Sequence, residues 1–329
     1  MKYSLFNENI KNGVFQSCYL LQGEENFVKE RSLQRLISTA VDGLLEWNFS
    51  LYDDVMEESA ILAAIEALPM MSSYRVVVIK DCPALLSRGG DMPNLLAAID
   101  HIPDTTILVF FMRQKADGKR SLSKILKPYI VEFPTLTDRE IAQYLRVDAK
   151  QNGYSFAPGA MEHLIFSVGK DMAQLVMEAE KLYLSTPPSG TITTQLVEEV
   201  VTKNTTANVF AIMDAAVAGN PKEAMVRLDS LLEEGEAPMA ILGAMAYRIR
   251  TLLQGKEATE AGLSVTDAQK NIRGPRFVVE RALREGRRFS KQQLVVALLA
   301  VAEADYGIKS GRVGDRQAVK NALMAGFGS

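Results

Sequence analysis

The chain has 329 residues, of which 47% are hydrophobic and 23% charged, so it can bury one or more large cores without disulfides or a structural metal. Its 40 acidic and 37 basic side chains give a net charge of −3, which excludes disordered and strongly charged classes of protein. Two cysteines, Cys18 and Cys82, are too few for a disulfide framework and predict a reducing, cytoplasmic location. The chain contains neither a membrane-length apolar run nor a secretory leader pattern, so we expect no membrane association.

The first part of the chain alternates strand-like and helix-like patterns. Four short apolar runs are rich in β-branched or aromatic residues: 18–21, 47–51, 76–79 and 106–111. Between the first two, apolar residues from Leu33 to Leu44 recur every three or four positions, which is typical of one helical face. Buried strands alternating with helices predict a parallel sheet covered on both sides, so residues 1–137 are interpreted as an α/β domain.

The rest of the chain predicts helices only. Residues 138–205 are interpreted as a small helical domain that ends near a polar stretch, and residues 206–329 as an all-helical bundle. Asn220-Pro221 and Ser290 followed by Gln293 are typical of capped helix starts. Residues 206–329 carry 17 basic and 14 acidic side chains, against 20 and 26 in residues 1–205. The basic excess is therefore in the helical end of the chain.

The sequence contains no recognisable catalytic or metal-binding pattern. The two histidines, His101 and His163, have no cysteine or carboxylate at ligand spacing, and neither HExxH nor CxxC occurs. There is no GxSxG elbow, and neither cysteine has an adjacent base. We therefore expect no catalytic, cofactor-binding or metal-binding residues, and interpret the cysteines as buried core residues.

The first strand-to-helix turn departs from a nucleotide-binding loop. Such a loop carries GxxxxGK[ST], whose glycines let backbone amides approach phosphate. This turn instead carries Glu24 and Glu25, with Lys29 as its only cation and no glycine before that lysine. Carboxylates at a helix N-terminus complement the helix dipole themselves and repel a triphosphate, so the turn predicts an acidic helix start without a ligand.

Two adjacent methionines precede the buried run 76–79. Pro69 ends the preceding helix, predicted over Ile61–Leu68, so Met70 and Met71 belong to a connection and not to a helical core stripe. Flexible, polarisable side chains of this kind suit an irregular apolar groove on a partner. The alternative, which the sequence leaves open, is that one or both cover the edge of the sheet.

Basic and aromatic residues near the C-terminus are candidates for nucleic-acid contact. Arg281, Arg284 and Arg288 are spaced to share one helical face that would meet phosphates, an acidic partner or solvent. Tyr306 lies beside a glycine and near cations, where it would stack on a base or pack on a neighbouring helix.

Taken together, these segments resemble the delta subunit of the bacterial DNA polymerase III clamp loader. Four stretches carry the resemblance, in the family's order: 19–25, 68–78, 180–182 and 304–311. The missing phosphate loop and the α/β, helical, helical plan agree with it.

The resemblance implies a degenerate AAA+ module in residues 1–137 and 138–205, the latter a small lid domain, followed by a helical collar in residues 206–329. Family members bind the ring-shaped sliding clamp, the beta subunit, and hold it open during DNA replication. They do not hydrolyse ATP, although they belong to a holoenzyme with DNA-directed DNA polymerase activity. The implied partners are the tau/gamma and delta-prime subunits, through the collar, and primer-template DNA. No cofactor is implied.

The resemblance also assigns roles to residues. The family's clamp-contacting apolar pair falls on Met70 and Met71, with Leu68, Pro69 and Tyr74 as flanking support. Tyr306 and the face of Arg281, Arg284 and Arg288 become candidates for DNA contact. The Ser-Arg-Cys arginine-finger motif of related subunits is not matched, because Gly89 follows Ser87-Arg88.

Two other functions compete with a non-catalytic clamp-opening subunit. An AAA+ ATPase with an atypical phosphate loop predicts measurable ATP binding by the chain alone. An independent helical DNA-binding protein predicts strong, salt-dependent DNA affinity of residues 206–329 without partners.

Overall fold

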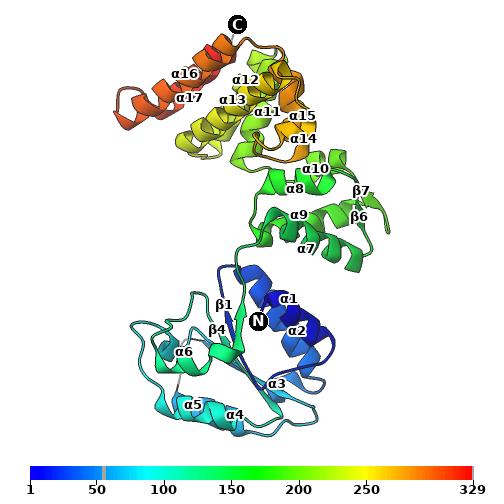
Figure 1. Cartoon of the computed structure of the whole chain (residues 1–329), viewed down its shortest axis with the longest axis vertical. Coiled ribbons are helices and arrows are strands. Elements are labelled where there is room, and N and C mark those ends of the chain that lie inside the picture. The colour runs from blue at the N-terminus through cyan, green and yellow to red at the C-terminus, as the bar shows by residue number, and fades with distance from the viewer. Residues whose placement is uncertain (54–56, 328–329) are drawn as a thin grey trace. The chain divides into compact units, whose positions relative to one another are not determined.

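In the computed structural model, residues 1–53 and 57–327 are described, and the chain divides into two compact units, Met1–Thr137 and Asp138–Ser329 (Figure 1). We call them the N-terminal and the C-terminal unit. The first is a parallel sheet covered by helices and the second is almost entirely helical, which confirms the predicted fold class. Across the described residues, we find no helix with the length and apolarity to span a bilayer.

The sheet of the N-terminal unit has five parallel strands in the order β2-β3-β4-β1-β5. They are β1 (Cys18–Gln22), β2 (Phe49–Tyr52), β3 (Arg75–Lys80), β4 (Thr106–Phe111) and β5 (Ile130–Glu132). Every residue of β1 and β4 is buried, as expected of continuous apolar strands. The three-residue strand β5, which pairs with β1, was not predicted because so short a run has no periodicity to detect.

Helices cover both faces of this sheet (Figure 1). On one face lie α1 (Tyr3–Lys11) and α2 (Asn26–Ala40), where the ring of Phe6 packs edge-on against Tyr19 at 5.0 Å. On the other lie α4 (Glu58–Glu66), α5 (Pro93–Ala98) and α6 (Ser121–Ile125), which share one hydrophobic core with alternate residues of β1, β3 and β4. This two-sided burial fixes the strands rigidly, so loops at their ends have a stable base.

Two predicted boundaries are wrong by a few residues. The run 47–51 was predicted as a strand, but Trp47 and Asn48 lie in the short helix α3 (Leu45–Asn48), because the Asn48 amide bonds back to the Leu44 carbonyl. Helix α4 ends at Glu66, two residues before the predicted Leu68. Pro69 disfavours helical backbone at the residue that precedes it, which accounts for the earlier end.

The C-terminal unit begins with four helices and one pair of two-residue strands. They are α7 (Asp138–Gln151), β6 (Ser155–Phe156), α8 (Ala160–Val168), α9 (Met172–Ser185), β7 (Thr191–Ile192) and α10 (Thr194–Val200). The pairing of β6 with β7 was not predicted. Seven helices follow: α11 (Thr205–Val217), α12 (Pro221–Glu233), α13 (Pro238–Glu260), α14 (Val265–Ala268), α15 (Arg276–Gly286), α16 (Lys291–Lys309) and α17 (Asp315–Phe327). The division of this unit at residue 205 stays a prediction.

Helix α13 is the centre of the later helices. Its buried Met245 and Ile249 share a core with Met213 of α11, Leu228 of α12 and Leu294 of α16. Ser290 caps α16 as predicted, since its hydroxyl accepts from the Gln293 amide at 3.1 Å and the Gln293 side chain accepts from the Ser290 amide. Asn220 makes no side-chain cap, and α12 begins instead with Pro221.

Candidate functional site

If the motif GxxxxGK[ST] is aligned with its first glycine at Gly23, its lysine falls on Lys29. Its side chain is buried, and Nζ donates to the carbonyl oxygens of Gly23 (2.8 Å) and Met112 (2.6 Å). These carbonyls directly follow the adjacent strands β1 and β4, and the chain leaves these two strands in opposite directions along the sheet. Parallel α/β sheets usually bind their ligands beyond the carboxyl ends of two such strands. The ammonium group therefore ties together the two sides of the place that a ligand would occupy.

The same turn is closed by the backbone after β5. The Phe133 carbonyl accepts from the Glu25 amide at 3.1 Å, and a Cβ on Gly23 would lie 2.2 Å from that carbonyl oxygen. With φ of +124°, Gly23 also has a backbone conformation that side chains rarely permit. Only glycine fits at position 23. In this turn the glycine allows the backbone at Phe133 to approach closely, whereas in a phosphate-binding loop it would allow a phosphate to do so.

The neighbouring strand ends carry a network of paired charges. Arg113 after β4 binds Asp81 after β3 (2.9 Å) and Asp53 after β2 (3.2 Å), and Lys80 binds Glu30 of α2 (2.9 Å). Burial lowers the pKa of Lys29 to about 8, and the nearby carboxylates, Asp81 foremost, limit that decrease. Within residues 1–53 and 57–327, no group of three or more His, Cys, Asp or Glu is arranged to hold a metal ion.

We expect Lys29→Met to destabilise the protein by about 1–3 kcal/mol, because two buried carbonyls lose their donor. The pKa of Lys29 is about 8 in the folded protein and 10.5 ordinarily, so between these pH values the unfolded chain binds more protons and the Lys29 contribution to stability rises with pH. Urea unfolding of both proteins should therefore show a difference that grows from pH 8 to pH 10. A constant or shrinking difference would contradict the assignment.

Met70 and Met71 lie on the surface of the N-terminal unit. Their exposed fractions are 48% and 83%, and that of Leu68 is 78%. Pro69 and Tyr74 are half-buried, and the Tyr74 ring packs edge-on against Phe15 at 5.2 Å. The connection between α4 and β3 therefore presents three large apolar side chains to solvent, and of the two alternatives the sequence left open, the structure has the exposed one.

Asn48 fixes the backbone of this loop. The side chain is fully buried, and its amide accepts from the Met70 N–H (2.7 Å) and donates to the carbonyls of Met70 (2.8 Å) and Leu44 (2.9 Å). One side chain thereby satisfies both backbone groups of an exposed methionine. The loop is held by specific bonds although its apolar side chains have no partner in the core.

Asp42 fixes the other end of the loop. Its carboxylate accepts from the Ser73 amide, the Ser72 hydroxyl and the Ser73 hydroxyl, each at 2.8 Å. These bonds, that of the Ser73 amide foremost, lower the pKa of Asp42 to about 2, so the carboxylate stays ionised and the loop stays tied at neutral pH. Next to it, a Cβ on Gly43 would lie 2.1 Å from the Met71 carbonyl oxygen, which shows how closely the two segments approach.

Of the three arginines proposed for DNA, Arg281 is engaged inside the protein. It binds Asp214 of α11 (2.9 Å) and Glu285 of α15 (3.0 Å), and the fully buried Arg248 of α13 binds the same two carboxylates. Desolvation raises the pKa of Asp214, and the two arginines oppose that increase. Arg281 therefore joins helices in this structure, while 37% of its side chain stays exposed.

The other candidates for DNA contact are exposed. Arg284 lies on α15, whereas Arg288 follows the end of that helix at Gly286, so the predicted continuous helical face is interrupted. Tyr306 of α16 is 57% exposed, and the Arg312 guanidinium lies 5.2 Å from the centre of its ring. These three side chains are more exposed than that of Arg281.

We expect Arg281→Gln to destabilise the protein by about 1–3 kcal/mol, because Asp214 and Glu285 lose a charged donor at a partly buried site. Arg284→Gln is the matched control on the same helix, because Arg284 is 68% exposed and makes only a longer contact with Glu285, at 3.5 Å; it should change stability by less than about 0.5 kcal/mol. Urea unfolding of the two variants checks this. Equal effects would mean that the ion pairs of Arg281 contribute nothing.

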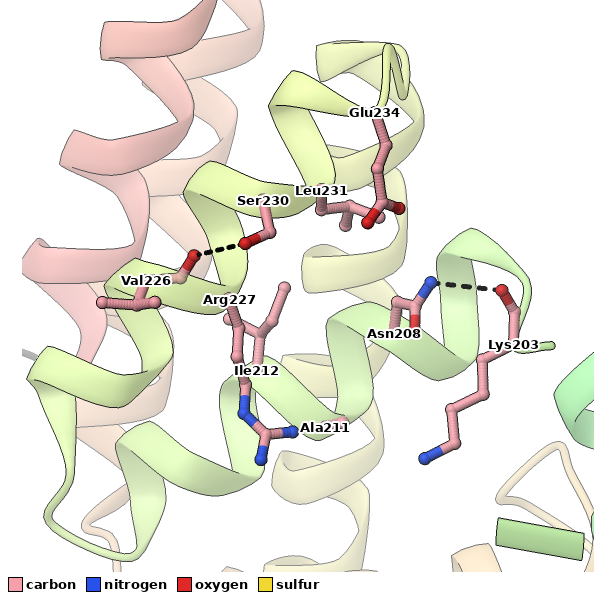
Figure 2. A pocket seen from close by; sticks show the side chains of 9 residues that line it. All are labelled: Lys203, Asn208, Ala211, Ile212, Val226, Arg227, Ser230, Leu231 and Glu234. Atoms are coloured by element: carbon pink, nitrogen blue, oxygen red, sulfur yellow. Dashed lines mark hydrogen bonds between the residues drawn. The ribbon is translucent and has the colours of Figure 1, made fainter. Parts of the chain in front are cut away.

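A surface hollow of about 210 Å³ lies between α11 and α12, and Figure 2 shows the side chains that line it. Its lining is Lys203, Asn208, Ala211, Ile212, Val226, Arg227, Ser230, Leu231 and Glu234. Arg227 is paired with Glu223 at 2.7 Å, and the Asn208 amide donates to the Lys203 carbonyl at 3.1 Å. The polar groups are thus partly used locally, and the hollow is smaller than most small-molecule sites.

Sequence reasoning missed the residues that hold the methionine loop. Asn48 lay in a predicted strand and Asp42 near a predicted helix end, and nothing in their local sequence marks them. Both act on partners more than 20 positions away. Only the tertiary structure reveals such bonds.

Comparisons with known proteins agree across most of the chain. Residues 19–133 match a family model described as "DNA polymerase III, delta subunit", and residues 206–325 match "DNA polymerase III delta subunit, C-terminal domain". The chain is 25% identical to the DNA polymerase III subunit delta of Bacillus subtilis, over 93% of this chain and 91% of that protein. It is 23% identical to the probable DNA polymerase III subunit delta of Aquifex aeolicus, over 78% and 75%.

A solved structure has the same fold. It is the Bacillus subtilis DNA clamp loader delta protein (YqeN), with a TM-score of 0.56, 23% identity and 99% of each chain covered. The likeness extends over both units of the present chain.

Proposed function

Because this chain belongs to the DNA polymerase III delta-subunit family, we propose that it binds the sliding clamp through Met70 and Met71 and holds the ring open for loading onto primed DNA. The observation that carries this proposal is a loop that is exposed in its side chains and fixed in its backbone. An anchor of this kind loses little conformational entropy on binding, so more of the burial energy remains as affinity.

The proposed anchor acts through apolar burial. Complete burial of a methionine side chain contributes about 1.5–3 kcal/mol before ordering costs. Met71, which is the more exposed of the pair, is the main contact. Leu68, Pro69 and Tyr74 support it from the flanks, as the family resemblance implies.

The chain opens the clamp if it binds the open ring more tightly than the closed ring. A ligand shifts a conformational equilibrium only by the difference in its affinity for the two states. The fixed loop presents one shape, so a clamp surface that fits it better when the ring interface is separated is stabilised in the open form. No covalent step is required of the chain.

We also propose that the chain does not hydrolyse ATP and needs no cofactor. Lys29 supports this, because its ammonium is bonded to backbone carbonyls at the usual ligand position and not directed to solvent. Neighbouring clamp-loader subunits, tau/gamma and delta-prime, would then supply the nucleotide-driven switching. Their binding to residues 206–329 as a collar, and action in the cytoplasm, are part of the same proposal.

DNA contact is proposed for Tyr306 and for Arg281, Arg284 and Arg288. Arg284, Arg288 and Tyr306 are exposed, and Arg281, which also pairs with Asp214 and Glu285, is partly exposed. Contacts to phosphate carry no sequence information, which suits a loader that acts at any primer.

The double variant Met70→Ala/Met71→Ala should bind the sliding clamp at least about tenfold more weakly than the unchanged protein, since 1.4 kcal/mol corresponds to tenfold. The measurement is equilibrium binding of the full chain to the clamp. Leu184→Ala, at an equally exposed apolar position on α9, is the control and should bind normally. Unchanged affinity of a folded double variant would remove the anchor.

The purified chain should show no detectable binding of a fluorescent ATP analogue in an equilibrium titration, because the ligand position is filled by Lys29 and flanked by carboxylates. A P-loop ATPase titrated in parallel is the positive control. Saturable binding by the chain would favour an AAA+ ATPase with an atypical phosphate loop instead.

A further inference from the structure

Three more large apolar side chains are exposed beside the methionine loop. They are Leu44, Leu45 and Trp47, which precede or lie in α3 and are each at least half exposed. We call this set the tryptophan ridge. Apolar groups gathered on one surface are uncommon in a protein that acts alone, and neither the fold nor the methionine anchor accounts for them.

The ridge and the methionine loop form one rigid surface. Asn48 follows Trp47 directly and bonds to Leu44 on one side and Met70 on the other. The Arg75 guanidinium donates to the Trp47 carbonyl at 2.7 Å and to the Ser50 hydroxyl at 2.9 Å. A surface that receives Met70 therefore lies within reach of the ridge.

The charge of the two segments indicates what covers the ridge. Residues 42–48 and 66–73 carry three carboxylates, those of Asp42, Glu46 and Glu66, and no lysine or arginine. All three acidic residues are exposed, and each lies within two sequence positions of an exposed apolar residue. With Arg75, which contacts Trp47 from β3, these three carboxylates leave a local net charge of −2, so a complementary surface is apolar at its centre and carries more basic than acidic groups at its rim.

We propose that the tryptophan ridge is a second contact with the sliding clamp, with Trp47 as its anchor. This proposal rests on the proposed function, and it places an apolar patch with basic neighbours beside the clamp cleft that receives the methionines. Tryptophan is the residue type most often found to dominate binding energy at interfaces. The clamp then grips the unit at two points, which fixes its orientation as well as its affinity.

The chain contains one tryptophan, so labelling the full-length protein with 5-fluorotryptophan gives a fluorine NMR signal from Trp47 alone. Saturating clamp should shift or broaden that signal. Trp47→Ala should weaken clamp binding by about tenfold or more, and Trp47→Phe by less. Unfolding by urea should be unchanged in both, since the side chain is 57% exposed.

The outcomes separate this proposal from the proposed function. If Trp47→Ala binds as well as the unchanged protein while Met70→Ala/Met71→Ala does not, the ridge is overturned and the clamp-binding function stands. If the unchanged protein does not bind the clamp, both the proposed function and the second clamp contact are refuted. If Trp47→Ala does not fold, two other results would still refute the second clamp contact. One is a fluorine signal of the unchanged protein that saturating clamp does not affect. The other is normal clamp binding by Leu45→Ser.

Discussion

The buried amide of Asn48 is the interaction on which the proposed partner-binding surface depends. Exposed apolar side chains have no core to hold them, and without another constraint a loop that carries them would sample many conformations. Asn48 supplies that constraint by satisfying both backbone groups of Met70 and the carbonyl of Leu44. The amide is fully shielded from water, so its bonds do not compete with solvent and the two apolar segments behave as one surface.

The two edges of the sheet have different uses. Parallel α/β sheets usually bind ligands at the carboxyl ends of their strands, and here Lys29 and the Arg113 ion pairs fill that edge with internal bonds. The methionine loop and the tryptophan ridge instead precede β3 and β2, at the amino ends of the strands. Internal bonds thus occupy the edge where parallel α/β sheets usually bind ligands, while the proposed recognition surface lies at the opposite edge.

Sequence patterns were sufficient for the fold class, the family and four of the five strands of the N-terminal sheet, because continuous apolar runs and Pro69 act locally. They did not reveal Asn48 or Asp42, whose partners are distant in the sequence. Arg281 is an example in which the sequence pattern predicted a role but not the internal contacts of the side chain. Its spacing with Arg284 predicted a shared basic face, but only the fold brings Asp214 of α11 to its guanidinium. Local patterns thus describe elements well, whereas the role of a polar side chain depends on what the fold places beside it.

Met71 has a backbone φ of +53°, in the left-handed region. This region costs an L-residue about 1–2 kcal/mol, and branching at Cβ adds to that cost. Evolution at this position is therefore constrained on two counts: glycine or asparagine relaxes the backbone but removes the hydrophobic contact, while valine or isoleucine keeps the contact and strains the backbone. Long apolar side chains without a branch at Cβ meet both requirements best. The backbone conformation of this one residue therefore restricts which residues can replace Met71.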